Sequence, residues 1–117
     1  MTGSVSYHAG KCAEDQVARF YAGSGRPVVA RRWRGVSGEI DVIARDGDAV
    51  VFIEVKQSKT HALAVEHLCE RQMQRLCRAA SDYLGGEPDG LNTSSRFDVA
   101  LVDAQGRIEI LPNAFAA

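Results

Sequence analysis

The chain has 117 residues and a net charge of −1, from 14 basic and 15 acidic side chains. A chain of this length supports one hydrophobic core, so we expect a single domain, and its charge does not indicate a strongly basic nucleic-acid-binding protein. The composition, 45% hydrophobic and 25% charged, is that of a globular domain rather than of a disordered, fibrous or disulfide-rich protein.

Apolar runs in this chain are short. The longest, residues 49–53, falls far below the roughly 20 residues of a membrane-spanning helix. Residues 1–8 lack the basic and apolar regions of a secretory signal. We therefore expect a cytoplasmic protein without membrane association, with a flexible N-terminus over residues 1–9 and one domain over residues 10–117.

The first element of the domain is expected to be a helix over residues 11–22, whose apolar side chains recur at spacings of three and four: Ala13, Val17, Phe20 and Tyr21. A strand over residues 28–34 and a turn over residues 35–38 follow. Three cysteines, Cys12, Cys69 and Cys77, form no C-x-x-C pair, and we interpret them as small buried residues.

A β-hairpin is predicted at the centre of the chain. Residues 39–45 and 49–57 are both rich in valine and isoleucine, and Asp46-Gly47-Asp48 separates them. A two-residue loop, Gly47-Asp48, suits a type II′ turn with glycine first and pairs Asp46 with Ala49. A three-residue loop without a bulge would shift the register by one residue.

The second half of the chain is expected to contain one long helix and a second hairpin. The helix spans residues 64–84 and ends at two glycines, with an apolar stripe of Val65, Leu68, Cys69, Leu76, Ala79, Ala80 and Tyr83. After a polar loop over residues 87–95, strands over residues 97–102 and 107–111 form the second hairpin. The fold class is α/β, a sandwich with a mixed five-stranded sheet flanked by helices.

Charged residues at the end of an apolar strand are the first candidates for a site. Glu54 and Lys56 are two residues apart, so they share one face of the strand, together with Phe52. Burial of a carboxylate is costly unless a cation or hydrogen bonds compensate it. A surface ladder of ion pairs explains the same pattern equally well.

The hairpin register supplies a second carboxylate. With a two-residue loop, Asp41 stands directly opposite Glu54, and two like charges there repel. A divalent cation would turn this repulsion into coordination, and oxygen ligands favour Mg²⁺ or Mn²⁺. With the alternative loop the two carboxylates would lie on opposite faces, and no metal site would form.

Two helical residues could join these carboxylates. Gln72 interrupts the apolar stripe of the long helix, where an inward polar side chain is usually a hydrogen-bonded part of the core but could face the carboxylates. Glu14 lies beside the apolar face of the first helix, three residues before Val17. Exposed glutamates are common on helices, so the second signal is weak.

Arginines form two local groups. Arg26, Arg31, Arg32 and Arg34 fall within nine residues that contain no acid, and Arg71, Arg75 and Arg78 follow helical spacing. Either group could be an ordinary solvated surface. Beside a metal site they could instead contact a phosphate backbone, the part of a nucleic acid that dominates its affinity for proteins. The residues that we predict to bind nucleic acid are Arg31, Arg32, Arg34, Arg71 and Arg75.

Several short segments together resemble a known family of small bacterial proteins. The segments are Gly10–Glu14 with Ala18, Gly38–Ile43, Val51–Lys56, Ala80–Leu84, Arg96–Val99 and Asn113–Phe115. They resemble the YraN-like, UPF0102 family, which is similar to the PD-(D/E)XK nuclease superfamily and to archaeal Holliday-junction resolvases. The resemblance implies a restriction-endonuclease-like fold over about residues 10–115.

The resemblance also implies roles for four residues. Asp41 matches the metal-binding aspartate of the superfamily, and Glu54 matches the second acidic ligand. Lys56 matches the lysine of the motif, and Glu14 matches the acidic residue of the first helix. Ile40 replaces the proline of the superfamily motif, which is not a ligand. Gln72 stands where the family usually carries lysine, although related nucleases often use glutamine at a comparable place.

The resulting hypothesis is a Mg²⁺- or Mn²⁺-dependent endonuclease that hydrolyses phosphodiester bonds in DNA, with branched or junction DNA as a candidate substrate. Asp41, Glu54 and the Val55 carbonyl would hold the metal, while Lys56 would orient or activate the water. Glu14 and Gln72 would tune the water or a second metal site. A resolvase would be a homodimer, because a four-way junction needs two symmetric cuts. The alternative is a non-catalytic nucleic-acid-binding module that retains the nuclease fold.

Overall fold

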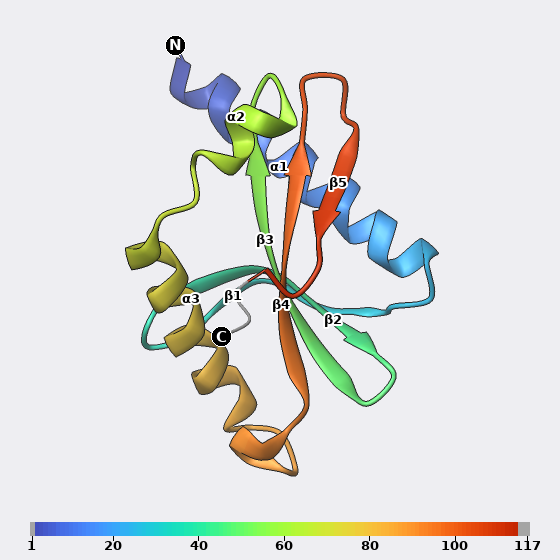
Figure 1. Cartoon of the computed structure of the whole chain (residues 1–117), viewed down its shortest axis with the longest axis vertical. Helices are drawn as coiled ribbons and strands as arrows, with labels where there is room; N and C mark the ends of the chain where they lie inside the picture. The colour runs from blue at the N-terminus through green and yellow to red at the C-terminus, as the bar shows by residue number, and fades with distance from the viewer. Residues whose placement is uncertain (1, 115–117) are drawn as a thin grey trace.

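The computed structural model describes residues 2–114, with side chains from Cys12 onward. Its elements are α1 (Thr2–Gly23), β1 (Val28–Arg34), β2 (Glu39–Asp46), β3 (Ala49–Gln57), α2 (His61–Val65), α3 (Glu70–Leu84), the 3-10 turn η1 (Gly90–Asn92), β4 (Ser95–Val102) and β5 (Ile108–Leu111). The five strands form one sheet in sequence order (Figure 1). Only β3 and β4 pair in parallel, so the predicted mixed five-stranded sheet is confirmed.

Helices α1 and α3 cover opposite faces of the sheet, as Figure 1 shows on either side of the strands. The apolar face of α1, with Val17 and Tyr21, packs on Val42, Val51 and Ile53. The apolar face of α3 packs on the other side, in a cluster of Ile40, Ile43, Val50, Phe52, Ala79, Ala80 and Leu84. Alternate residues of β3 therefore belong to different clusters, as the twofold period of a strand requires.

The hairpin of β2 and β3 has the predicted two-residue loop. Asp46 pairs with Ala49, and the ladder runs in register to the pair of Val42 and Ile53. Gly47 has φ 61°, whereas the only non-glycine residues of positive φ within residues 2–114 are Arg32 and Asn113. A positive φ at the first loop position alone is the geometry of a type II′ turn. One further step along this register places Asp41 opposite Glu54.

The predicted helix over residues 64–84 is wrong, because two helices occupy this segment. Cys69, directly before α3, has extended backbone angles, φ −133° and ψ 155°. The two helices pack at different places: Ala64 of α2 contacts Val99 and Leu101 of β4, whereas α3 packs in the cluster around Phe52. One straight helix could not satisfy both contacts. The expected stripe is interrupted accordingly, and Val65 is 39% exposed.

Other expectations need smaller corrections. Helix α1 begins at Thr2 and is longer than the helix expected over residues 11–22, while Met1 and Phe115 lie outside the described residues. Phe20 is 42% exposed, and Ala18 is buried in its place. All three cysteines are exposed rather than buried, because Cys12 and Cys77 lie on the outer sides of α1 and α3, and Cys69 lies before α3 begins. Within residues 2–114, no helix is long and apolar enough to cross a membrane.

Candidate functional site

Asp41 lies where the β2–β3 ladder ends. Its Oδ2 accepts a hydrogen bond from the backbone N–H of Val55 at 2.9 Å. Counted from the hairpin loop, the last backbone pair of the ladder is Val42 and Ile53, and Asp41 is the next residue of β2. The Asp41 carboxylate is therefore held by the backbone of β3, beside Glu54, and its position does not depend on a flexible side chain of another element.

Glu54 is the most buried charged group at this end of the sheet, with 8% of its surface exposed. Its Oε2 accepts from the side-chain amide of Gln72 at 2.7 Å and lies 3.1 Å from Nζ of Lys56. Both contacts use the same oxygen, so Oε1 receives no amide or ammonium donor from residues 12–114. Contacts of this kind compensate part of the cost of burying the Glu54 carboxylate.

The two carboxylates affect each other electrostatically. Burial and the neighbouring Glu54 carboxylate raise the pKa of Asp41 from 3.8 to about 7, against the opposing effects of the Val55 N–H and the Lys56 charge. Such a rise is expected when two like charges share a partly desolvated site. When Asp41 is ionised, the two carboxylates carry two negative charges and Lys56 supplies one positive charge.

A pocket of about 230 Å³ opens directly onto the pair, lined by Gly38, Glu39, Asp41, Glu54, Gln72, Arg75 and Leu76. Of the predicted site residues, the structure thus brings Asp41, Glu54, Lys56 and Gln72 together. Gln72 reaches Glu54 because α3 restarts at Glu70 and turns this side chain toward β3. Within residues 2–114, no group of three or more His, Cys, Asp or Glu residues is arranged to hold a metal ion.

Glu14 of α1 forms an ion pair with an arginine of β1. Its Oε1 accepts from Nε of Arg32 at 2.8 Å, a contact between α1 and β1. The two other arginines of β1 also meet acids, because Arg31 pairs with Asp15 of α1 and Arg34 lies 3.2 Å from Glu39. These three arginines, predicted to contact nucleic acid, are therefore neutralised within the chain itself.

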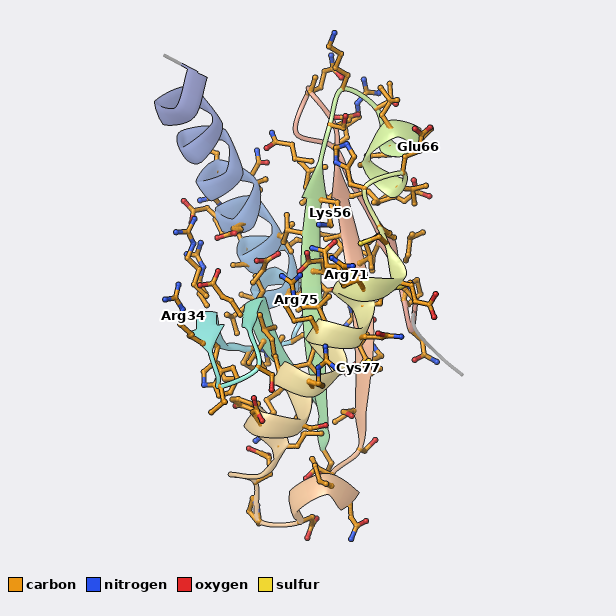
Figure 2. All side chains as sticks on the ribbon, turned by 90° about the vertical axis from the view of Figure 1, so that its left-hand side faces the viewer. Arg34, Lys56, Glu66, Arg71, Arg75 and Cys77 are labelled. Atoms are coloured by element: carbon orange, nitrogen blue, oxygen red, sulfur yellow. The ribbon has the colours of Figure 1, made fainter. Side chains whose placement is uncertain are left out.

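The arginines of α3 are arranged differently. Arg71, Arg75 and Arg78 are exposed, and within residues 12–114 no acid lies within ion-pair distance of them. Arg75 lines the pocket, and its stem rests on Gly38, where an added Cβ would lie 3.1 Å from the Arg75 Cγ. In Figure 2, Lys56, Arg71 and Arg75 lie in the middle of the face turned to the viewer, while Arg34 lies at its left edge.

A second buried carboxylate, Asp98 of β4, received no role in the sequence interpretation. It is 1% exposed and accepts hydrogen bonds from the Tyr21 hydroxyl at 2.8 Å, Nε of Arg96 at 3.1 Å and the Asn113 N–H at 3.0 Å. Burial and these Asp98 interactions raise the pKa of Tyr21. The signal was present in the sequence, as an acid inside an apolar strand two residues after an arginine. Because donors from this chain surround Asp98, it ties α1, β4 and the C-terminal segment together.

Comparison with known proteins gives one family. The model of the uncharacterised protein family UPF0102 matches residues 13–102. A UPF0102 protein of Cereibacter sphaeroides is 67% identical over 117 residues, which is 100% of both chains. UPF0102 proteins of Ruegeria pomeroyi and Roseobacter denitrificans are 57% and 45% identical, over 97% of this chain and 92% and 88% of theirs. These names carry no activity.

Proposed function

This chain belongs to the UPF0102 family, and we propose that it is a metal-dependent endonuclease that hydrolyses phosphodiester bonds in DNA, in the manner of PD-(D/E)XK nucleases. The observation that carries the proposal is the carboxylate pair of Asp41 and Glu54 on adjacent strands, with Lys56 two residues further along β3. A surface ladder of ion pairs would not bury Glu54 or raise the pKa of Asp41 to about 7.

The donor set fits Mg²⁺ or Mn²⁺. Both ions prefer oxygen ligands, and Mg²⁺ commonly uses one or two carboxylates while retaining several waters. Asp41 and Glu54 supply the carboxylates, and the Val55 carbonyl, in the residue whose N–H already binds Asp41, is the third candidate ligand. When bound, the ion would polarise the phosphate and help to make a water nucleophilic.

The side chains around the pair have separate tasks. Lys56 Nζ, 3.1 Å from Glu54, would orient the attacking water and offset the charge that develops on the phosphate. Gln72 holds Oε2 of Glu54 at 2.7 Å and so fixes which carboxylate oxygen faces the pocket. The Val55 N–H similarly fixes the rotamer of Asp41. Positioned groups of this kind lower the barrier because they need no rearrangement during the reaction.

The substrate would bind mainly through α3. Arg75 lines the pocket and Arg71 precedes it by one turn, so both can contact phosphates on either side of the scissile bond. The net charge of −1 limits non-specific affinity for long DNA. Selectivity for a particular DNA structure, such as a branch or a four-way junction, fits this charge better than indiscriminate digestion.

The test is a cleavage panel of linear duplex, single-stranded and four-way-junction DNA, each with Mg²⁺, Mn²⁺ or EDTA. We expect metal-dependent cutting by the natural chain and a loss of about 1,000-fold in the cleavage rate for Asp41→Asn and for Lys56→Ala. Glu66→Gln, at an exposed position of the adjacent turn, is the matched control and should cut normally.

Two results would contradict this function. Cutting that persists in Asp41→Asn would mean that the carboxylate pair is not the catalytic centre. Tight DNA binding without cutting in either metal would instead favour the non-catalytic binding module.

A further inference from the structure

Two further acids, Glu14 and Glu39, form ion pairs with arginines of β1. Glu14 of α1 is bound by Arg32 at 2.8 Å, and Glu39 at the rim of the pocket lies 3.2 Å from Arg34. Both arginines come from the strand next to β2, which carries Asp41. Glu54 also has an ion-pair partner, Lys56 at 3.1 Å, but Glu54 and Asp41 line the same pocket, whereas Glu14 is not among its lining residues within 12–114.

The backbone of β1 departs from regular geometry to make one of these contacts. Arg32 has φ 50°, a left-handed conformation that non-glycine residues adopt at a cost. As a result the alternation of the strand is broken: Ala30 and Trp33 both pack in the cluster under α3, while Arg31 and Arg32 both reach acids of α1. The strained backbone at Arg32 thus turns this side chain to the same face as Arg31, where it binds Glu14.

The register places this contact next to the site. Arg31 pairs with Val42 and Trp33 with Ile40, so Arg32 stands beside Asp41 on the neighbouring strand. The Arg32 guanidinium extends toward α1, where it binds Glu14, and Glu14 is not among the residues of 12–114 that line the pocket of Asp41 and Glu54. Its negative charge is thus balanced by a fixed cation of the chain rather than left for a metal.

We propose that β1 restricts the site to a single divalent cation, with Glu14 serving as a positioning residue that ties α1 to β1 and not as a metal ligand. This inference rests on the proposed metal site. A second ion about 4 Å from the first would require further carboxylates on the same pocket. Glu39 lines the pocket and Glu14 is the acidic residue of the first helix, and each is held by an arginine of β1.

The experiment counts bound Mn²⁺ by titration calorimetry and by the electron paramagnetic resonance signal of the free ion, on the full chain without DNA. We expect one Mn²⁺ per chain. Glu14→Gln keeps an oxygen that can accept from Arg32, and should change the Mn²⁺ affinity by less than about threefold. Asp41→Asn and Glu54→Gln should each weaken Mn²⁺ binding by more than about tenfold.

The outcomes separate this inference from the proposed function. Two Mn²⁺ ions per chain, or a loss of about tenfold or more in Glu14→Gln, would overturn the single-ion site and leave the nuclease proposal standing. A chain that binds no Mn²⁺ but is folded by circular dichroism would overturn both. One ion per chain that depends on Asp41 and is insensitive to Glu14→Gln supports the inference, whether or not the DNA tested is cut.

Discussion

The two arginine groups of this chain look alike in composition but differ in their surroundings. Arg31, Arg32 and Arg34 of β1 each meet an acid of α1 or β2. Arg71, Arg75 and Arg78 of α3 meet none within residues 12–114. An arginine whose charge is already balanced gains less from a phosphate, because binding must first break or share an existing ion pair. The arginines of α3 are therefore better candidates than those of β1 for contact with a polyanion.

The local sequence of α3 explains why Arg75 lacks an acidic partner. Arg78 does have an acid four residues further on, Asp82, whose carboxylate accepts a hydrogen bond from the Ser37 N–H. On a helix, a side chain meets those three and four residues away. For Arg75 these positions hold Arg71, Gln72, Arg78 and Ala79, none of which is acidic. Neighbouring like charges cost a helix about 0.2–0.5 kcal/mol per pair. The chain therefore retains an unfavourable arrangement on the face that borders the pocket, which is consistent with a use in binding.

The largest expected effect tests this difference directly. The double variant Arg71→Gln/Arg75→Gln should lower the affinity for DNA by about tenfold or more and reduce the slope of log affinity against log salt by about 2, since two phosphate contacts are lost. The matched variant Arg31→Gln/Arg34→Gln removes the same charge from β1 and should change the affinity by less than about threefold. Fluorescence anisotropy at several salt concentrations measures both. Equal losses would abolish the distinction between the two groups.

The next largest effect is expected in the pH dependence of stability, through Asp41 of the carboxylate pair beside the α3 arginines. The pKa of Asp41 is raised from 3.8 to about 7, so the folded chain retains a proton that the unfolded chain releases. The free energy of unfolding of the metal-free protein should therefore fall as the pH rises from about 4 to about 7. Asp41→Asn should flatten this dependence in urea denaturation curves recorded with EDTA. Parallel curves for the two proteins would show that Asp41 titrates normally.

A smaller effect is expected in the stability of the β1 contacts. Arg32→Gly removes the guanidinium that binds Glu14, which lowers the stability of the fold. Glycine also suits the positive φ of this position, and this relief of backbone strain raises the stability. Arg32→Ala loses the same ion pair without relieving the backbone and should be the less stable variant by about 1 kcal/mol. Thermal denaturation of both variants measures the difference. Equal stabilities would indicate that the backbone at Arg32 relaxes freely.

The smallest effect should come from Gly38. An added Cβ would lie 3.1 Å from Cγ and 3.2 Å from Cδ of Arg75, so Gly38→Ala should displace the stem of this arginine. We expect DNA affinity to fall by about twofold, less than when the charge is removed. Gly38 also has φ 158°, at which alanine is strained, so a native circular dichroism spectrum of each variant is the control. In the background of Arg75→Gln, the same substitution should have no further effect on DNA affinity. An additional loss there would mean that Gly38 acts through another group.

Much of the central site could be predicted because local chemistry sets it. Gly47 at the first position of a two-residue turn fixes the register of β2 and β3, and that register puts Asp41 opposite Glu54. The polar interruption at Gln72 was a further usable signal, and this side chain does reach Glu54. The break before α3 was not predictable from periodicity, because Val65 and Leu76 would lie on one stripe of a continuous helix.

The sequence by itself therefore determined the sheet, the hairpin register and the facing carboxylates, since turn geometry and strand periodicity act between residues close in the chain. Only the tertiary structure decided which charges remain available. Glu14 and Arg32 are separated by 18 residues, and Arg31 and Asp15 by 16, so neither ion pair follows from a strand or helix period. Their formation depends on how α1 lies across the sheet and on the backbone of Arg32, which long-range packing holds in place.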